Sequence, residues 1–442
     1  MSTHDTTVSV RMYNVGFGDA FLITVDDDDT AWRMLVDCGV HSHGRFKVDG
    51  RSREIGETVS TIVSDLRSAS TNGDPPRLDV VVATHRHTDH VSGFADAEWD
   101  AVEVGEVWVS FVEDPDDTDA VALRTGQVES AEAIHAAART LAASDRPGRD
   151  SHRRALAEAL ALNSMFDGPN RKAMSRLLSA GDGRFAGDPR VRFLPDLEPD
   201  RNRIATSVAG ASVTVLGPSR DPADLKRMDP PKKDHWIAYA DALDPEKPHA
   251  PLPLFAPSFA VEAGAITAGL SDDPTLAALL EVADDADLDE LGSELDPLLA
   301  AAAVLERAVN NTSVFFVLDV HGHRLLFVGD SQEGAWRHVL DDPAARTHLD
   351  GLIFYKIGHH GSHNATPRRF VDEVLAHQPV YAMLPWGSVP EWDDTIPEPH
   401  LISALGDTAA KIVRADALID DPIVTQDPEK RWTQITFTIP EP

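Results

Sequence analysis

The sequence is short of cysteine and of positive charge. Cys38 is the single cysteine among 442 residues, which excludes an internal disulfide. The chain has 40 Lys and Arg residues against 73 Asp and Glu residues, a formal net charge of −33 at pH 7. Such a charge repels polyanions unless basic residues gather locally, and the arginine pairs of this chain are scattered. The composition therefore argues against binding of long nucleic acids.

Long apolar runs and a leader-like start are also lacking. The chain has no apolar run of the ~18 residues that a membrane span needs. Residues 1–5 carry neither the basic flank nor the apolar stretch of a signal peptide. We therefore expect a soluble, cytoplasmic protein with no membrane partner. With 42% apolar residues, the chain can still bury a substantial core.

Side chains that bind transition metals are concentrated directly after an apolar, strand-like run at 78–83. The segment Thr84–His90 reads THRHTDH. Its first two histidines share a face of extended backbone, and its aspartate and last histidine can reach a second point beyond the turn. A single histidine here would more often be structural, but the set predicts two neighbouring metal ions. The candidate ligands are His85, His87, Asp89 and His90.

This segment resembles the HxHxDH motif of the metallo-β-lactamase superfamily. Three further motifs follow the order of that superfamily: VGFGD at 15–19, LLFVGD at 325–330 and KIGHHGS at 356–362. They resemble the ComEC-type metallo-hydrolase subfamily, named after DNA-uptake proteins. The resemblance implies an α/β fold, a four-layer αββα sandwich, with 1–442 as one domain.

The resemblance also implies a dinuclear metal site. Two divalent ions per chain are expected, zinc by preference for imidazole ligands, with manganese as a substitute. His85 and His87 would bind one ion, Asp89 and His90 the other, and an aspartate after the Gly-Asp strand would bridge them. We favour His360 as a ligand and His359 as the residue facing substrate, although the reverse stays open. The implied metal ligands are His85, His87, Asp89, His90, Asp330 and His360.

The chain departs from the wider superfamily at one ligand position. Where a third histidine is usual, this sequence has NNTS at 310–313, as ComEC-type domains have Asn-x-x-Ser. An amide is a poor zinc ligand, so Asn310 or Asn311 is expected to orient water or substrate. Lys356 could stabilise anionic charge or form a structural salt bridge, and Asp37 and Asp19 are expected to hold a ligand imidazole. The candidate catalytic residues are Asp89, His359, Lys356 and Asn311.

Two segments have no counterpart in the motif set. Residues 113–205 are predicted as a helical insertion, with Ala- and Leu-rich helical spacing from 119 to 182. Residues 219–308 are predicted as an acidic helical insertion, because 271–307 carry 11 acidic residues against 1 basic residue. We expect both to lie beside the mouth of the metal site, where they could also engage a protein partner.

The expected chemistry follows from the metals. Hydrolysis at neutral pH needs a hydroxide nucleophile, and a water shared by two divalent cations loses its proton at far lower pH than bulk water. The resemblance favours a phosphodiesterase that uses a metal-bound hydroxide, and the net charge favours a small or single-stranded substrate. Two alternatives remain at this point: a lactone or thioester hydrolase, and a regulatory or binding module in which the metals only stabilise the fold.

Overall fold

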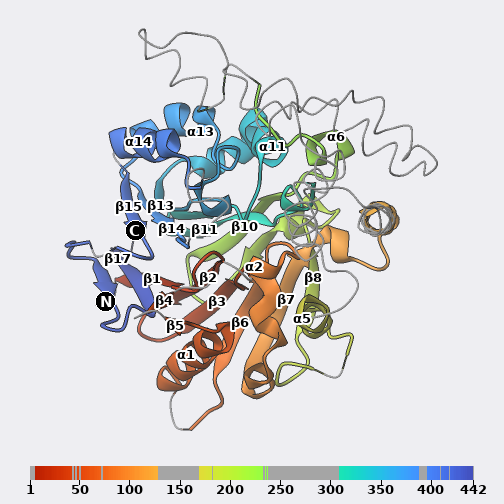
Figure 1. The fold of residues 1–442 in the computed structure, drawn as a ribbon, viewed down its shortest axis with the longest axis vertical. Coiled ribbons are helices and arrows are strands. Elements are labelled where there is room, and N and C mark those ends of the chain that lie inside the picture. The colour runs from red at the N-terminus through yellow and green to blue at the C-terminus, as the bar shows by residue number, and fades with distance from the viewer. Residues whose placement is uncertain are drawn as a thin grey trace, which may run out of the picture.

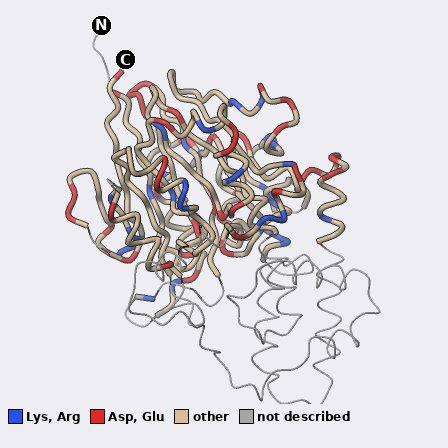
Figure 2. The backbone as a smooth tube through the Cα atoms, turned by 90° about the horizontal axis from the view of Figure 1, so that it is seen from above, with Lys and Arg blue, Asp and Glu red and all other residues tan. Residues whose placement is uncertain are grey.

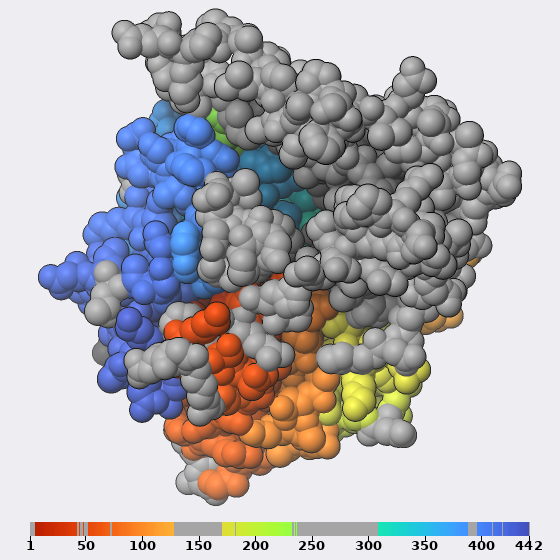
Figure 3. All heavy atoms as spheres, viewed as in Figure 1, coloured from red at the N-terminus to blue at the C-terminus, as the bar shows by residue number. Residues whose placement is uncertain are grey.

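Two mixed β-sheets face each other and carry helices on their outer sides, as the computed structural model shows (Figure 1). It describes residues 5–41, 44, 47–48, 51–70, 73–127, 169–181, 183–231, 234, 236, 308–387, 396–408, 410–417 and 419–441. On the face shown in Figure 3, the N-terminal part of the chain (red to orange) and the C-terminal part (blue) lie against each other.

The first sheet has the strand order β16-β17-β1-β2-β3-β6-β7-β8, antiparallel from β16 to β3 and parallel from β3 to β8. Its strands are β1 (Thr6–Tyr13), β2 (Ala20–Asp26), β3 (Ala31–Cys38), β6 (Arg77–Ala83), β7 (Glu103–Ser110), β8 (Arg190–Leu194), β16 (Val424–Gln426) and β17 (Trp432–Ile439). A separate ribbon pairs β4 (Lys47–Val48) with β5 (Arg51–Ser52).

The second sheet repeats this pattern in the order β15-β14-β13-β12-β11-β10-β9, antiparallel from β9 to β12 and parallel from β12 to β15. Parallel strands place their carboxyl ends at one edge, so each sheet offers one edge where loops can meet. Its strands are β9 (Arg203–Ala205), β10 (Ala211–Gly217), β11 (Phe315–Val320), β12 (His323–Phe327), β13 (Leu352–Lys356), β14 (Tyr381–Leu384) and β15 (Lys411–Arg414).

The core between the sheets is built from the inward faces of both. Phe316 and Phe327 of the second sheet stack with ring centroids 5.1 Å apart, and Phe327 meets Phe21 of the first sheet edge-on at 6.4 Å. Strand β6 is apolar on both faces because Val80 and Val82 join this core while Leu78 and Val81 pack under helices. The run 78–83 is therefore a buried strand, and this rigid strand leads into the THRHTDH segment.

Helices cover the outer face of each sheet. Helix α1 (Ile55–Ser68) begins at a capping box formed by Glu54 and Glu57 and buries Val59, Ile62 and Leu66, at helical spacing, against the first sheet. The second sheet is covered by helices α11 (Glu333–Asp341), α13 (Arg368–Glu373) and α14 (Pro399–Asp407) (Figure 1). Among the described residues, further helices include α2 (Thr88–Val91), α5 (Pro169–Leu177), α6 (Pro222–Leu225) and α12 (Pro343–Arg346).

The predicted four-layer sandwich is confirmed, and the strand-like run at 78–83 lies in β6. One prediction needs correction. The range 113–205 is not a helical insertion throughout, because β8 belongs to the first sheet and β9 to the second. Both are short edge strands, of 5 and 3 residues, too short to give a clear periodic pattern.

Most of each predicted insertion, at 128–168 and 237–307, lies outside the described residues. Of the second insertion, the structure describes 219–231, which include α6. The predicted place of both insertions beside the metal site therefore stays a prediction. None of the helices in the described part of the chain has the length and apolar character that a membrane crossing requires.

Helix α11 carries a carboxyl group that should make stability depend on pH. Burial raises the pKa of Glu333 to about 7; the positive charge of Arg227 opposes this shift and the negative charge of Asp234 adds to it. A raised folded-state pKa means that the folded protein keeps a proton which the unfolded chain loses, so stability falls as the pH rises from about 4.5 to 7. Glu333→Gln removes this loss.

At pH 8 we expect Glu333→Gln to have a higher melting temperature than the wild type, with an unfolding free energy larger by up to about 3 kcal/mol. At pH 4.5 we expect the two proteins to have the same melting temperature. Thermal melts of both proteins at the two pH values measure the difference. An equal gain at both pH values would show that packing, and not the buried charge, separates the two proteins.

Candidate metal centre

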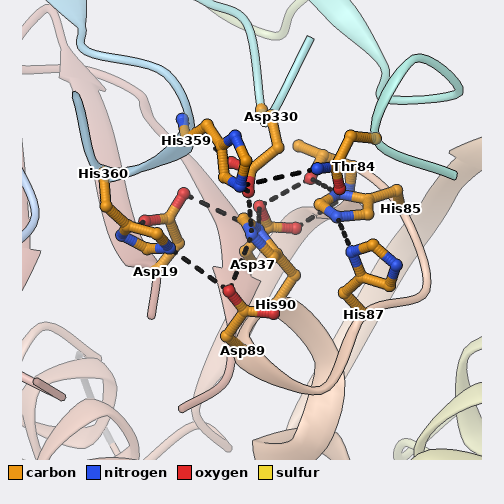
Figure 4. Close-up of polar contacts among 12 residues, drawn as sticks. Asp19, Asp37, Thr84, His85, His87, Asp89, His90, Asp330, His359 and His360 are labelled. Atoms are coloured by element: carbon orange, nitrogen blue, oxygen red, sulfur yellow. Dashed lines mark hydrogen bonds and ion pairs between the residues drawn. The ribbon is translucent and has the colours of Figure 1, made fainter. Parts of the chain in front are cut away.

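The sequence motifs meet at the carboxyl ends of the parallel strands (Figure 4). The THRHTDH segment follows β6 and turns into α2, Asp330 follows β12, and His359 and His360 follow β13 in a short 3₁₀ turn. Asp19 lies just before β2 and Asp37 near the end of β3. Loops that are distant in sequence thus converge on one point between the two sheets.

Close backbone contact holds α2 against the end of β3. The amide of Asp19 donates to the carbonyl of Asp89 at 3.0 Å, and the amide of Gly39 donates to the carbonyl of Asp19 at 3.0 Å. A Cβ atom on Gly39 would lie 2.5 Å from the carbonyl oxygen of Thr88 and from the amide nitrogen of His90. Glycine is therefore required at 39 for this approach.

Asp37 fixes the orientation of His90. Its carboxylate accepts hydrogen bonds from the backbone amide of Thr84 at 2.7 Å and from the Thr84 hydroxyl at 2.7 Å, and lies 2.8 Å from Nδ1 of His90. With its proton on Nδ1, His90 directs Nε2 toward Oδ2 of Asp330 at 3.1 Å. Asp37 therefore holds a candidate ligand in the tautomer that leaves Nε2 free to bind a metal.

Four buried side chains form one candidate metal site. Their ligand atoms all lie within 4.8 Å of one another, and Nε2 of His360 is 3.2 Å from Oδ2 of Asp89. Two carboxylates and two imidazoles suit zinc and also manganese. The four residues are Asp89, His90, Asp330 and His360.

The other two histidines converge beside this cluster. Nε2 of His85 lies 2.9 Å from Nδ1 of His87, close to the separation of about 3.3 Å between two ligands of a tetrahedral zinc ion. Nδ1 of His85 is 3.2 Å from the hydroxyls of both Thr84 and Ser313. The Ser313 hydroxyl also accepts from the amide of Asp330 at 3.1 Å, so it joins the two motifs.

The charge and the unsatisfied atoms of the site fit bound cations. Several buried polar atoms of the site have no hydrogen-bond partner, among them Oδ1 of Asp89 and Nε2 of His87, and each such atom costs about 1–3 kcal/mol. The ammonium of Lys356 balances only part of the buried carboxylate charge. Divalent cations would supply the missing charge and partners. The buried carboxylates are those of Asp19, Asp37, Asp89 and Asp330.

Burial controls the protonation of the imidazoles. It lowers the pKa of His87 to about 4 and lowers the pKa of His85 well below its ordinary value, so both are neutral near pH 7 and can bind a metal. His90 differs. Burial would lower its pKa too, but the surrounding carboxylates, led by Asp330 and Asp89, outweigh burial and hold the pKa of His90 well above its ordinary value.

The paired histidines of the HHGS motif occupy different surroundings. The side chain of His360 is 2% exposed and contacts Asp89, whereas that of His359 is 15% exposed and lies 3.5 Å from the amide of Asn310. Both residues have positive φ angles, 42° and 50°, an uncommon conformation that turns their side chains apart. This placement supports His360 as the ligand and His359 as the residue facing substrate.

Lys356 and Asn311 each contact several protein groups. Nζ of Lys356 pairs with Asp19, donates to the carbonyl of Gly329 at 3.1 Å and lies 3.5 Å from Oδ1 of Asp330. These contacts favour the structural alternative for Lys356. The side chain of Asn311 donates to the carbonyls of Leu225 and Arg227 and accepts from the amide of Gln332. Asn311 therefore holds the chain near α6, and its neighbour Asn310 is the amide beside His359.

The comparisons with known proteins agree with this site. A family model described as the metallo-beta-lactamase superfamily matches residues 13–98, the part that contains the VGFGD turn and the THRHTDH segment. No curated protein matches the chain. Residues 13–98 are thus similar to a superfamily whose fold is that of metal-dependent hydrolases. The likeness to the ComEC-type subfamily rests on the motifs alone.

Proposed function

We propose that this protein is a dinuclear metal-dependent hydrolase, and that its reaction is the cleavage of a small or single-stranded phosphodiester. The observation that carries the proposal is the meeting of two ligand groups. The cluster of Asp89, His90, Asp330 and His360 lies beside the converging nitrogens of His85 and His87, and each group has its own supporting residues. Bound there, divalent ions would polarise a phosphoryl oxygen and lower the pKa of a water.

The protein's own residues would orient the substrate and exclude solvent. His359 is the partly exposed member of the site, and its backbone amide donates to Oδ1 of Asp330 at 3.1 Å, which fixes the loop. Burial lowers the pKa of His359 to about 4. At neutral pH its neutral ring offers an N–H donor, which suits a hydrogen bond to a phosphoryl oxygen better than a full proton transfer.

Charge supports a small or single-stranded substrate. Lys and Arg are interspersed with Asp and Glu along the described chain, and no basic track runs along that part of it (Figure 2). A protein that grips many phosphates needs such a track, and its binding weakens steeply with salt as counterions are released. A short diester reaches the metals without making those contacts.

The test is a substrate panel with zinc- and manganese-loaded protein. We expect cleavage of bis-para-nitrophenyl phosphate, and little cleavage of a phosphomonoester, a lactone and a thioester. Binding to long DNA should be weak at physiological salt. Preference for the lactone or thioester would support the alternative hydrolase, and absence of all hydrolysis by protein that holds its metals would support a regulatory or binding module. Tight binding and rapid degradation of long DNA at physiological salt, whether single- or double-stranded, would refute the argument from charge.

The roles of the paired histidines can be separated by matched variants. His359→Ala is expected to lower turnover of the activated diester by about 10²-fold while metal content stays near that of the wild type. His360→Ala is expected to lower metal content as well, because His360 contacts Asp89 inside the ligand cluster. Elemental analysis together with steady-state kinetics distinguishes them. Loss of metal from His359→Ala alone would reverse the two assignments.

A further inference from the structure

A mostly buried arginine lies between the two histidines of the His85–His87 pair. Nε of Arg86 donates to Oε1 of Glu113 at 2.8 Å, and Nη2 donates to Oε2, so the ion pair is bidentate. The side chains are 14% and 7% exposed. Glu113 ends the 3₁₀ turn Phe111–Glu113 that follows β7. A bidentate pair of this kind fixes direction as well as distance.

The backbone of Arg86 is held from the other side. The side-chain amide of Asn170 donates to the carbonyl of Arg86 at 3.2 Å, and Asn170 is 3% exposed near the start of α5. Helix α5 packs against α2 and against the turn Ser92–Ala95. Its Arg176 donates to the carbonyl of Phe94 at 2.8 Å. Glu113 and α5 therefore fasten the metal-binding loop to the segment 113–205, from outside the sandwich core.

Fixing Arg86 fixes the two ligands beside it. His85 and His87 share one face of the chain, so a rotation of the peptides at 86 would swing both rings and separate Nε2 of His85 from Nδ1 of His87. The Asp89–His90 side of the site has its own support, since His90 is oriented by Asp37. Loss of the Arg86 contacts should thus disturb one half of the centre and leave the other half in place.

We propose that Arg86 is a positioning residue, clamped by Glu113 and Asn170, that sets metal affinity at the His85–His87 pair without contacting metal or substrate. Two of its guanidinium nitrogens are engaged with Glu113, which directs the guanidinium toward the turn after β7. The inference rests on the proposed dinuclear centre. On this proposal, the segment 113–205 supports the His85–His87 half of the metal centre.

The experiment is a titration of metal-free protein with Co²⁺, followed by visible absorption and by calorimetry. The wild type should bind two ions. Arg86→Met should bind one ion with wild-type affinity and the other about 10- to 100-fold more weakly, the range typical when a residue that supports a metal ligand is removed. The matched control is Arg192→Met, which breaks a bidentate pair (2.6 and 2.8 Å) with Glu106 of β7, the strand before the turn that holds Glu113, and should bind both ions normally.

Two results would overturn the proposal: wild-type binding of both ions by folded Arg86→Met, or an equal loss in Arg192→Met, which would indicate general destabilisation. Circular dichroism shows whether each variant is folded. If Arg86→Met does not fold, Glu113→Gln and Asn170→Ala take its place, and normal binding of two ions by both would refute the clamp. A wild-type protein that binds no cobalt would instead refute the proposed function itself.

Discussion

Replacing Asp330 with alanine is expected to abolish hydrolysis while the protein stays folded. Asp330 is 1% exposed, and its Oδ2 lies 3.1 Å from Nε2 of His90 within the four-residue cluster. Its charge also raises the pKa of His85 and of His87, against the larger effect of burial, so it lies close to both halves of the site. A carboxylate in this place can bind both metals, and turnover should fall on the order of 10³-fold or more without it.

The fold should survive because the remaining groups keep partners. Lys356 would lose one contact but retain its ion pair with Asp19 and its hydrogen bond to Gly329. The measurements are turnover of the activated diester, metal content and melting temperature. Asp319→Ala is the control, since it removes a carboxylate paired with Arg324 in the β11–β12 hairpin, away from the site, and should keep turnover normal. Wild-type turnover by Asp330→Ala would refute the bridging role.

Much of this site could be predicted because its ligands follow apolar strands at short spacing. The run 78–83 is buried on both faces, so its apolar residues identified the strand and placed the histidines at its end. The motif order then predicted which loops meet. Spacing does not tell which of two adjacent side chains points into the site. Asn310 and Asn311 turn in opposite directions, and only the fold shows that Asn311 contacts the chain at Leu225.

Side-chain contacts between residues far apart in the sequence could not be predicted from it. Arg86 and Glu113 are 27 residues apart, and neither belongs to a pattern that signals pairing. The role of Lys356 was open for the same reason, since its partner Asp19 lies in the first motif of the chain. The edge strands β8 and β9 were hidden because 5 and 3 residues are too few for a clear alternating pattern.

Removal of the metals is expected to abolish activity and to lower stability. Four carboxylates are buried in the site, and Lys356 is the ammonium beside them. In the metal-free protein, negative charges that repel one another therefore stay buried without solvation by water, which lowers stability. Ions that bind only the folded state add about 4 kcal/mol of stability when present at a thousand times their dissociation constant. We therefore expect close to two divalent ions per chain and a fall of several degrees in melting temperature after chelation.

Elemental analysis of the purified protein and thermal melts before and after chelation measure both effects. Activity should return with Zn²⁺ or Mn²⁺, because imidazole and carboxylate ligands accept either ion, and should not return with Ca²⁺, which prefers six to eight oxygen ligands. Return of the melting temperature without activity would favour a module in which the metals only stabilise the fold. Carefully prepared protein without a tightly bound transition metal would refute the metal centre, since the buried carboxylates would then have to be neutralised by protons.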